Sequence, residues 1–374
     1  MVPLLEPQDP DRAVGDSPVR SRTRAAGATH FHRYSHGREW ARIPRSQVDY
    51  EAILDDGAML WDLYGECGTA FRGPDARRAV DLLVTARTAD LAPGRCRYTP
   101  VADHDGVFLC GAVIVVVSDG EWWVANGSID FALWAKAHAV AERLDVEVTV
   151  PDLGLLGVVG RRAPAILGAL GAATPEPFRS EPAVIGGVEV VVSATAWGGG
   201  YELYVRGAGS TGPVWDAVVG AGAPFGLQVG DPGLASARAA EQGFDDLTVW
   251  ATPFAITVLE HGGGRFVDRT KDRFVGKAAI DAELTAGIRR RVAGVVLEQG
   301  VGVPDRESGY PVVVVDGVAV GHGLEFHRSL ALDRTIGFVL VDGSVRAVPA
   351  TIGVAPGHLT SRRILADARG LGIG

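Results

Sequence analysis

Short valine-rich runs separated by glycine turns fill the chain from Arg289 to its end, and they restrict the possible folds more than any other feature. Four of these runs read RRVAGVVLE, YPVVVVDGVAVGHGLEFH, TIGFVLV and SVRAVPATIG. β-branched residues favour strands, and glycine-containing pairs such as Asp-Gly favour tight turns between antiparallel strands. The spacing of runs and turns therefore predicts a small antiparallel β-barrel over residues 275–374.

Upstream of this region, segments with helix spacing and segments with strand spacing alternate. DYEAILDDG has the apolar spacing of a short helix, and MLWDLYGECGTAFRG alternates like strands that end at a Gly-Pro turn at 73–74. The segment ARRAVDLLVTA predicts a helix. From Arg97 the pattern predicts a three-strand meander with a turn at 103–106, and then a helix over 129–144.

A second unit with similar order begins near Val146. It predicts a strand, a Gly-Arg break and a helix that opens at Pro164, because proline is favoured in the first turn. Two strands around a glycine-rich link follow in GGVEVVVSATAWGGGYELYVR, and then the helices VWDAVVGAG and SARAAEQG. Because antiparallel connections dominate, the predicted fold class is α+β.

Length and composition limit the kind of protein this is. The chain has 374 residues, of which 47% are apolar, and it is too long for one ordinary domain. Its most apolar uncharged stretch, 107–118, is shorter than the ~18–20 residues that span a bilayer. The Pro- and Asp-rich segment 1–27 lacks the pattern of a signal peptide, so we expect a disordered leader. These features predict a cytoplasmic protein without a membrane partner.

The charge balance and the cysteines exclude further classes. Lys+Arg 36 against Asp+Glu 45 gives a net charge of −9, which repels phosphate backbones, so we expect no nucleic-acid partner. The spacing of the cysteines matches neither a zinc site nor a disulfide framework, which predicts reduced thiols. The three are Cys67, Cys96 and Cys110.

Two clusters of titratable side chains have the composition of metal or acid–base sites. His30, His32 and His36 lack a Cys or carboxylate at a matching interval, so we predict that no metal binds there. Asp103 and Asp105 flank a histidine at the predicted hairpin tip, where neighbouring charges can shift each other's pKa. Asp and Gly are also favoured at such tips by turn geometry alone, so both interpretations of the hairpin stay open.

The segment Gly207-Ala-Gly209-Ser-Thr-Gly212 has the spacing of a dinucleotide-binding turn, with Asp231 about 20 residues further on. The strand YELYV before it alternates polar and apolar residues, whereas a buried parallel strand would be apolar throughout. Pro213 offers a simpler explanation, a helix start after a flexible turn. A dinucleotide oxidoreductase therefore ranks last among the functional hypotheses.

Glu202 follows three glycines within a predicted strand and has Tyr201 and Tyr204 beside it. Glycines allow another molecule to approach the backbone closely. A carboxylate recessed beside aromatic rings can accept paired N–H donors from a flat heterocycle. The alternative is a glutamate at a sheet edge that faces water.

Several segments resemble the glycine-cleavage T-protein (aminomethyltransferase) family over roughly residues 45–374. They are RGPDARRAVDLL, ADLAPGRCRYTPVADHDG, SIDFALWAKA, GGYELYV, VWDAVVGAGAPFGLQ, TPFAITV and DRFVGKAAI. The resemblance implies a three-domain ring with tetrahydrofolate as cofactor in a central channel. It implies a discontinuous folate-binding domain at 28–56 plus 146–260, an inserted α+β domain at 57–145 and the C-terminal barrel at 275–374.

Within this family the chain is more similar to the tetrahydrofolate-dependent demethylase branch, typified by dimethylsulfoniopropionate demethylase and the vanillate-type O-demethylases. The segments RYTPVADHDG and SIDFALWAKA carry this similarity. The resemblance implies that Glu202 binds the pterin, that Trp197 packs near pterin or substrate, and that Tyr98 is catalytic. It also implies a small methylated substrate and no lipoyl carrier partner.

Further residues are implied as parts of the same site. Tyr201, Asp103 and Arg238 are expected near the cofactor, and Cys110, Gly111 and Trp123 along the substrate channel. Two departures stand out. A family carboxylate is missing at Cys110-Gly111, and the family arginine falls on Ala239, which puts Arg238 one position early and about 100° around a helix.

The leading hypothesis is a folate-dependent methyl transferase or demethylase that acts on an O-, S- or N-methyl group of a small molecule. Alignment of two reacting atoms can supply much of the rate, so the loss of one carboxylate is compatible with demethylation. The alternatives are a folate-binding protein without catalysis and a methylene or aminomethyl transferase of specialised metabolism.

Overall fold

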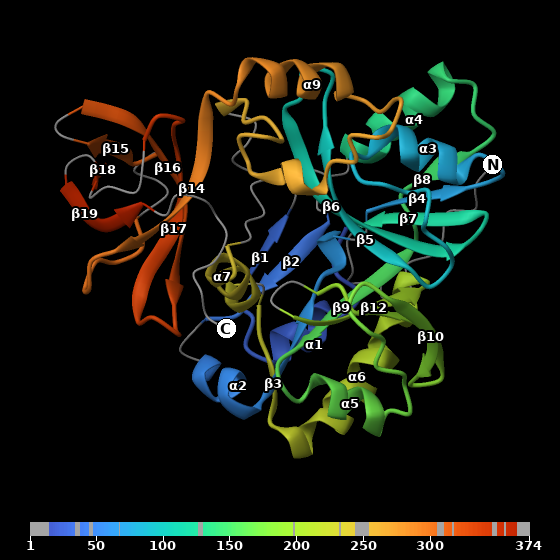
Figure 1. Cartoon of the computed structure of the whole chain (residues 1–374). Helices are drawn as coiled ribbons and strands as arrows, with labels where there is room; N and C mark the ends of the chain where they lie inside the picture. Colours follow the sequence, from blue (N-terminus) through green and yellow to red (C-terminus); the bar gives the residue numbers. More distant parts are fainter. Residues whose placement is uncertain are drawn as a thin grey trace. The chain divides into compact units, whose positions relative to one another are not determined.

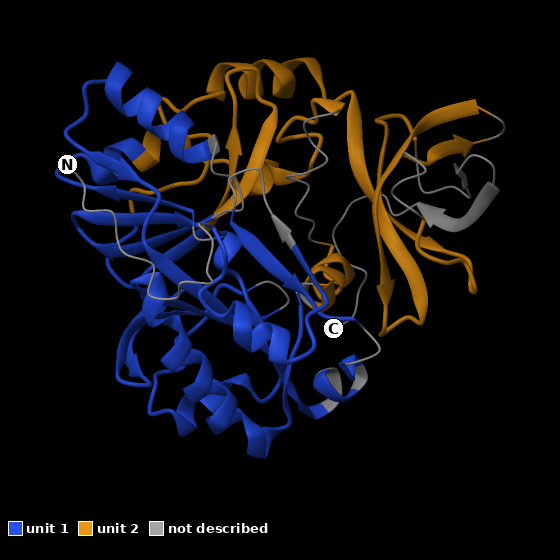
Figure 2. Ribbon diagram, turned by 180° about the vertical axis from the view of Figure 1, so that it is seen from behind, with its two compact units in different colours: residues 1–79, 91–97, 113–232 blue, residues 80–90, 98–112, 233–374 orange. Residues whose placement is uncertain are grey.

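The chain divides into two compact units, which Figure 2 colours separately. The computed structural model describes residues 15–364 except for 34–37, 45–47, 67, 126–129, 197–198, 232, 244–253, 305–309, 316–317, 346–349 and 355–356. Unit 1 comprises residues 1–79, 91–97 and 113–232, and unit 2 comprises residues 80–90, 98–112 and 233–374. Helices and mainly antiparallel sheets occur in both, which confirms the α+β class.

Unit 1 is built around a six-stranded sheet with the strand order β10-β11-β12-β9-β3-β13. Its neighbouring strands run antiparallel, apart from β13, which runs parallel to β3. The strands are β3 (Ala58–Asp62), β9 (Leu153–Val159), β10 (Ser180–Ile185), β11 (Val188–Ser193), β12 (Gly200–Arg206) and β13 (Leu227–Val229).

The two faces of this sheet differ in chemistry because side chains alternate along each strand. On one face, residues such as Leu60, Leu156 and Leu203 form a buried apolar cluster with α5 (Ala163–Ala169) and α6 (Thr211–Gly222). Figure 1 shows both helices beside β9 and β12. The other face carries the polar residues described below as the candidate site.

The segment with dinucleotide-turn spacing follows β12 and begins α6. β12 lies between two antiparallel neighbours, β11 and β9, which a βαβ nucleotide-binding unit does not have. Gly207 adopts φ +74, and a short 3-10 turn, η3 (Ala208–Ser210), leads into the helix. The simpler explanation, a helix start after a flexible turn, is therefore confirmed.

A five-stranded sheet has the order β5-β6-β7-β4-β8. The apolar run predicted at 107–118 forms β6 (Phe108–Ser118), the longest strand of this sheet. The other strands are β4 (Thr69–Arg72), β5 (Cys96–Ala102), β7 (Glu121–Ala125) and β8 (Glu147–Thr149), and two of the helices predicted from the sequence are α3 (Ala76–Leu83) and α4 (Asp130–Ala141).

The last six strands close into a barrel in the order β14-β17-β16-β15-β18-β19. β14 pairs with both β17 and β19, and these pairings close the barrel. Its interior contains Val295, Val313, Val339 and Val341, as the valine-rich runs predict. The strands are β14 (Arg290–Leu297), β15 (Val312–Val315), β16 (Val318–Ser329), β17 (Arg334–Asp342), β18 (Ala350–Val354) and β19 (Gly357–Ile364), and unit 2 also contains α7 (Gly233–Glu241) and α9 (Lys277–Ala286).

The N-terminal segment differs from the disordered leader predicted for residues 1–27. Residues 20–25 form α1 (Arg20–Ala25), and Val19 before it is fully buried in the apolar cluster under the six-stranded sheet. Arg22 donates two hydrogen bonds to Asp216 of α6. The sequence did not reveal these anchors because each partner lies far away along the chain.

The N-terminal part also forms a two-stranded sheet of β1 (His30–Arg33) and β2 (Glu39–Arg42). The helix predicted over the segment DYEAILDDG is present as α2 (Tyr50–Asp56), and the Asp49 carboxylate caps it by accepting from the backbone N–H of Ala52. One predicted domain boundary shifts, because β3 after residue 57 joins the six-stranded sheet. The other boundaries and the three-domain ring stay predictions.

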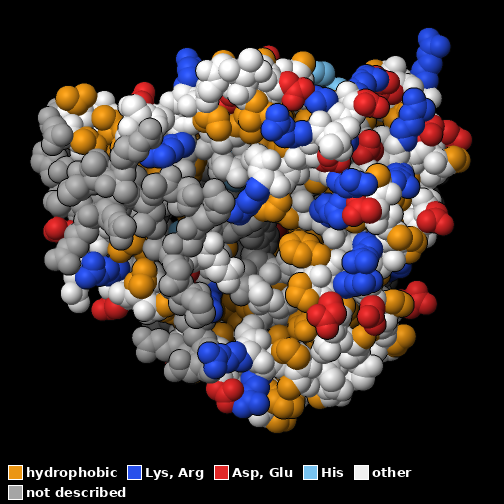
Figure 3. Space-filling view, viewed as in Figure 1, with side chains coloured by type: hydrophobic (Ala, Val, Ile, Leu, Met, Phe, Trp, Pro, Cys, Tyr) orange, Lys and Arg blue, Asp and Glu red, His pale blue; other side chains and the backbone are white. Residues whose placement is uncertain are grey.

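Acidic and basic side chains are interspersed among the described residues of the face shown in Figure 3. The net charge of −9 is thus not gathered into one acidic field on this face. In the described part of the chain, no helix is long and apolar enough to cross a membrane.

Lys271 is buried at the carboxyl end of α3. Its ammonium group donates hydrogen bonds to the backbone carbonyls of Asp81, Val84 and Ala86, and it lies 3.0 Å from the Asp81 carboxylate. Carbonyls at a helix end lack helical partners, and a cation there also interacts favourably with the helix dipole. Burial lowers the pKa of Lys271, while Asp81 opposes this change.

We expect Lys271→Met to lower the free energy of unfolding by about 2–4 kcal/mol, because three carbonyls lose their charged donor. Urea denaturation measures this change as a lower midpoint at constant slope. The matched control is Lys277→Met, which removes a pair with Asp281 on α9. That change should cost less than about 0.5 kcal/mol, and equal losses for the two variants would contradict the role given to Lys271.

Candidate functional site

Glu202 lies on the face of the six-stranded sheet opposite to α5 and α6. It pairs with Gly157 of β9, and Gly157 pairs in turn with Trp61 of β3. On its other side Glu202 pairs with Ser193 of β11. Residues directly opposite each other on antiparallel strands point to the same face. These four residues therefore form one row across the sheet, which we call the glutamate row.

Two hydroxyl groups hold the buried carboxylate of Glu202. Thr195 Oγ1 donates a hydrogen bond to Glu202 Oε2, and the Tyr204 hydroxyl donates to the same oxygen over 2.8 Å. Burial raises the pKa of Glu202, and both hydrogen bonds oppose this change. Among the described residues none donates a hydrogen bond to Oε1, so one carboxylate oxygen can accept from a ligand.

Trp123 packs against the tyrosine that binds this carboxylate. The ring centroids of Trp123 and Tyr204 are 5.5 Å apart. The Trp123 indole N–H donates to Glu121 over 3.0 Å, and the Arg206 guanidinium lies 5.1 Å from its ring centroid. Burial tends to raise the pKa of Glu121, but hydrogen bonds from Arg206, Trp123 and Arg72 lower it overall. Trp123 is thus held in a fixed orientation beside Tyr204.

Cys96 lies next to the glutamate row, with its sulfur 3.7 Å from Ser193 Oγ. Burial raises the pKa of the Cys96 thiol to about 11. The thiolate is the nucleophilic form of cysteine, so this thiol is unreactive at neutral pH. It contributes packing and a weak hydrogen bond.

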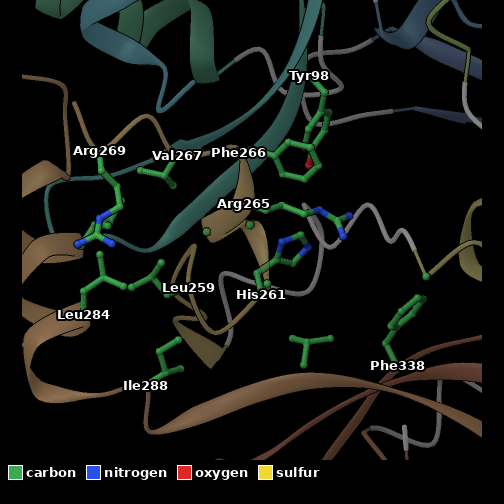
Figure 4. A pocket seen from close by; sticks show the side chains of 16 residues that line it. Tyr98, Leu259, His261, Arg265, Phe266, Val267, Arg269, Leu284, Ile288 and Phe338 are labelled. Atoms are coloured by element: carbon green, nitrogen blue, oxygen red, sulfur yellow. The ribbon is translucent and has the colours of Figure 1, made fainter. Parts of the chain in front are cut away.

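Tyr98 lies elsewhere, at a cavity of about 390 Å³ within unit 2. The cavity is within the size range of sites for small molecules, and its lining is mainly apolar. Figure 4 shows Tyr98 beside Phe266, and Leu284 and Ile288 in another part of the lining. The polar groups around it come from Tyr98, His261, Arg265 and Arg269.

Aromatic contacts fix two of the polar groups at this cavity. The Tyr98 ring meets the Phe266 ring edge to face, with centroids 4.8 Å apart. The His261 ring stacks on Phe108 at 4.2 Å. These contacts fix a tyrosine ring and a histidine ring in the lining of a mainly apolar cavity, which suits a small molecule with an apolar body and a polar end.

Gly111 provides the space for the Tyr98 hydroxyl. A Cβ atom on Gly111 would lie 2.7 Å from the Tyr98 hydroxyl oxygen, which is too close for any side chain. Cys110 beside it is buried in β6. The position where the family resemblance implies a carboxylate therefore lies against a phenol hydroxyl.

Asp103 and Arg238 are occupied by contacts within the protein. Asp103 Oδ1 accepts hydrogen bonds from the backbone N–H groups of Asp105 and Val107, each over 2.9 Å. This arrangement is an Asx-type turn and supports the turn interpretation of the hairpin. Arg238 donates to Glu241 of the same helix over 3.1 Å. Their roles toward a cofactor stay predictions.

Of two further predicted residues, one lies on the other face of the sheet and one falls outside the described structure. Tyr201 packs against the apolar cluster on the helix-covered face of the sheet, opposite to the glutamate row. Burial and the Glu176 carboxylate raise the pKa of its hydroxyl. Trp197 lies outside the described residues.

Sequence reasoning missed Thr195 and Trp61. Thr195 lies seven residues before Glu202, and no periodic pattern connects a link residue with the strand that follows it. Trp61 belongs to the apolar strand AMLWD, in which a tryptophan signals only burial. A prediction that residues 188–206 form a β-hairpin, with the correct pairing of its two strands, could have placed Thr195 near Glu202. Trp61 could be identified only once the structure showed that β3 and β12 both pair with β9.

The family resemblance implies a pterin, and the glutamate row fits one. Glu202 offers a carboxylate oxygen to ring N–H groups, and charge-assisted hydrogen bonds of this kind are the stronger ones. Gly157 beside it has no side chain, and the indole of Trp61 lies over it on the same face. Burial excludes competing water.

Comparisons with known proteins agree on one family. Residues 24–271 match the family model described as the GCVT N-terminal domain. Dimethylsulfoniopropionate demethylase DmdA of Ruegeria pomeroyi is 29% identical over 338 residues, which cover 86% of this chain and 90% of that protein. An aminomethyltransferase of Streptomyces coelicolor is 30% identical over 325 residues, which cover 83% of this chain and 84% of that protein.

A solved structure shares the fold. The glycine cleavage system aminomethyltransferase T from Bartonella henselae superimposes with a TM-score of 0.79 and 17% sequence identity, over 94% of this chain and 97% of that one. At this identity the likeness concerns the fold alone.

The raised pKa of Glu202 predicts a pH-dependent stability. The folded state holds this proton more tightly than the unfolded chain does, so stability falls as pH rises from the ordinary glutamate pKa of ~4.3 through the folded value. We therefore expect Glu202→Gln, without ligand, to raise the free energy of unfolding at pH 7 by on the order of 1 kcal/mol.

Urea denaturation between pH 4 and pH 8 measures this effect. The gain of Glu202→Gln over the unmodified protein should shrink as pH falls toward 4, where the carboxyl group is largely protonated in both states. Glu189→Gln, at an exposed position of β11, serves as control and should change stability little at any pH. A gain that is independent of pH would refute this account of Glu202.

Proposed function

This chain belongs to the GCVT family of glycine-cleavage T-proteins and is a tetrahydrofolate-dependent one-carbon transferase, and within that family we propose that it removes a methyl group from a small molecule. The observation that supports the binding half of this proposal is the buried Glu202 carboxylate with one oxygen open to a donor. The similarity to a demethylase over most of both chains supports the reaction type.

Glu202 binds the pterin in this proposal, and Thr195 and Tyr204 hold its carboxylate in place. N–H groups of the ring that donate to the open oxygen Oε1 compensate the charge of a carboxylate that is otherwise expensive to bury. Trp123, fixed by Glu121, packs behind Tyr204 and keeps that hydroxyl oriented. When bound, tetrahydrofolate supplies the N5 atom that accepts or gives the one-carbon group.

Tyr98 is the proposed catalytic residue. Its hydroxyl can donate a hydrogen bond to the substrate atom that loses the methyl group, or to a substrate carboxylate. The apolar cavity supports a small methylated molecule as substrate, and Arg265 at its lining can attract an anionic group on that molecule. Holding the substrate in line supplies much of the rate in such a transfer.

Aminomethyl or methylene transfer is the second candidate, favoured by the similarity to aminomethyltransferases. The sequence Leu109-Cys110-Gly111, where the resemblance implies a carboxylate, argues against it. A turnover screen with tetrahydrofolate and methoxylated aromatics, sulfonium acids and methylated amines separates the two. Formation of 5-methyltetrahydrofolate supports the proposal, and binding without any turnover contradicts it.

The finer organisation belongs to the same proposal. We propose a three-domain ring with a central folate channel, which the fold likeness supports. We also propose cytoplasmic localisation and a substrate presented free in solution, without a lipoyl carrier protein. The net charge of −9 supports the absence of a nucleic-acid partner.

We expect Glu202→Gln to weaken tetrahydrofolate binding at least about tenfold, or roughly 1.4 kcal/mol, because a neutral amide replaces the charged acceptor. Anaerobic titration calorimetry measures the dissociation constant. Glu189→Gln, on the neighbouring strand β11, should bind like the unmodified protein. Equal affinities for Glu202→Gln and the unmodified protein would rule out Glu202 as the pterin carboxylate.

We expect Tyr98→Phe to reduce turnover by about one to three orders of magnitude, since the change removes only the hydroxyl group and keeps the contact with Phe266. Steady-state kinetics on a substrate found in the screen measures this loss. Tetrahydrofolate affinity and melting temperature should hardly change. Tyr310→Phe, which removes a phenol hydroxyl from an exposed position, is the control. Full turnover in Tyr98→Phe would show that this hydroxyl takes no part in the reaction.

A further inference from the structure

A buried indole N–H of the glutamate row has no acceptor in the described structure. Trp61 is 1% exposed, and its Nε1 atom has no hydrogen-bond partner among the described residues. Buried donors without a partner are rare because they forfeit their hydrogen bonds to water. A phenylalanine at this position would fill much of the same space without that loss. The unpaired N–H group therefore indicates that a bound ligand supplies its hydrogen-bond acceptor.

The position of the indole relative to Glu202 follows from the strand register. Trp61 and Glu202 both pair with Gly157, one from each side. A Cβ atom on Gly157 would lie only 1.4 Å from Trp61 Nε1, so the indole nitrogen lies directly over the glycine. Adjacent strands are ~4.8 Å apart. The donor of Trp61 thus lies over the strand next to the one that carries Glu202, on the same face of the sheet.

Gly157 is required for this arrangement. Any side chain there would occupy the place of the indole nitrogen and would displace it from the row. The row therefore offers a hydrogen-bond donor over β9 and a hydrogen-bond acceptor on the adjacent strand β12. Such a pair is complementary to a ring edge that carries N–H donors followed by a carbonyl acceptor.

We propose that Trp61 Nε1 donates a hydrogen bond to the carbonyl oxygen of the heterocycle whose N–H groups Glu202 binds, and that Trp61 makes the site specific for a 4-oxo pterin. This inference rests on the proposed function, since it assigns a second contact to the same ligand. The 2-amino, N3–H and 4-oxo groups of a pterin are consecutive on one edge, in the order donor, donor, acceptor. Trp61 is then a binding and specificity residue that takes no part in the transfer itself.

A 4-amino pterin tests the assignment directly. Replacement of the 4-oxo group by an amino group puts an N–H where the carbonyl stood, so two donors face each other. The contacts with Glu202 also change in this analogue, so the affinity of one ligand alone is not decisive. The ratio of the two affinities, compared between variants, isolates the contact with Trp61.

The experiment measures dissociation constants of tetrahydrofolate and of its 4-amino analogue by anaerobic calorimetry. For Trp61→Phe we expect tetrahydrofolate affinity to fall about fivefold to tenfold and affinity for the 4-amino analogue not to fall. The preference for the 4-oxo ligand should thus fall at least about fivefold, which corresponds to about 1 kcal/mol. A preference equal to that of the unmodified protein would overturn the inference.

Trp215→Phe is the matched control. Trp215 is buried in the cluster on the helix-covered face of the same sheet, so the change removes an indole from the opposite side. Its two affinities and their ratio should equal those of the unmodified protein. A loss of preference in Trp215→Phe as large as in Trp61→Phe would overturn the inference, because it would show a general effect of sheet packing.

A measurement on the unmodified protein avoids any folding defect of the variant. The eight tryptophans are labelled with ¹⁵N, and their indole N–H resonances are followed by NMR during titration. An indole resonance that moves downfield with tetrahydrofolate and not with the 4-amino analogue supports the assignment. Absence of any such downfield shift overturns it.

The experiments distinguish a failure of the proposed folate function from a failure of the role proposed for Trp61. If the unmodified protein binds neither ligand, the proposed folate function fails and the role of Trp61 fails with it. If tetrahydrofolate binds and Glu202→Gln weakens it while Trp61→Phe keeps the full 4-oxo preference, only the role of Trp61 is refuted.

Discussion

A carboxylate buried in a β-sheet is the constraint on which the candidate site depends. Glu202 is 5% exposed, and its charge is unfavourable there unless donors surround it. Thr195 and Tyr204 supply two donors, both to one oxygen. The other carboxylate oxygen still needs hydrogen-bond donors, which a ligand with N–H groups can supply. In the proposed function, the same feature that is expected to weaken the unliganded fold at neutral pH favours binding of that ligand.

Two glycines leave room for aromatic side chains at the two candidate sites. Gly157 allows the indole of Trp61 to lie across β9 beside Glu202, and Gly111 allows the hydroxyl of Tyr98 to lie against β6. In both places an aromatic side chain occupies the volume that a Cβ atom would take. Substitution of either glycine would move a polar group of the site without touching that group directly.

The chemistry proposed here depends on positioning more than on strong acids or bases. Cys96 is held neutral by burial, and Asp103 is used within its turn. The described groups at the Tyr98 cavity are a phenol, an imidazole and guanidinium groups around an apolar space. Such a set can orient a small molecule and stabilise a leaving atom by hydrogen bonding. These demands suit the methyl transfer proposed above.

The sequence by itself determined the local elements: the valine runs of the barrel, the apolar strand β6, and helix starts such as Asp49 before α2. Those features depend on neighbouring residues and on a period of two or 3.6, which a sequence displays directly. Motif spacing also identified Glu202 as a candidate. Only the tertiary structure decided which strands are neighbours, and hence that Trp61, Gly157 and Glu202 share one row. It likewise ordered residues 15–27 through distant partners of Val19 and Arg22. Strand register and burial arise from contacts between residues far apart in the chain, and no local pattern encodes them.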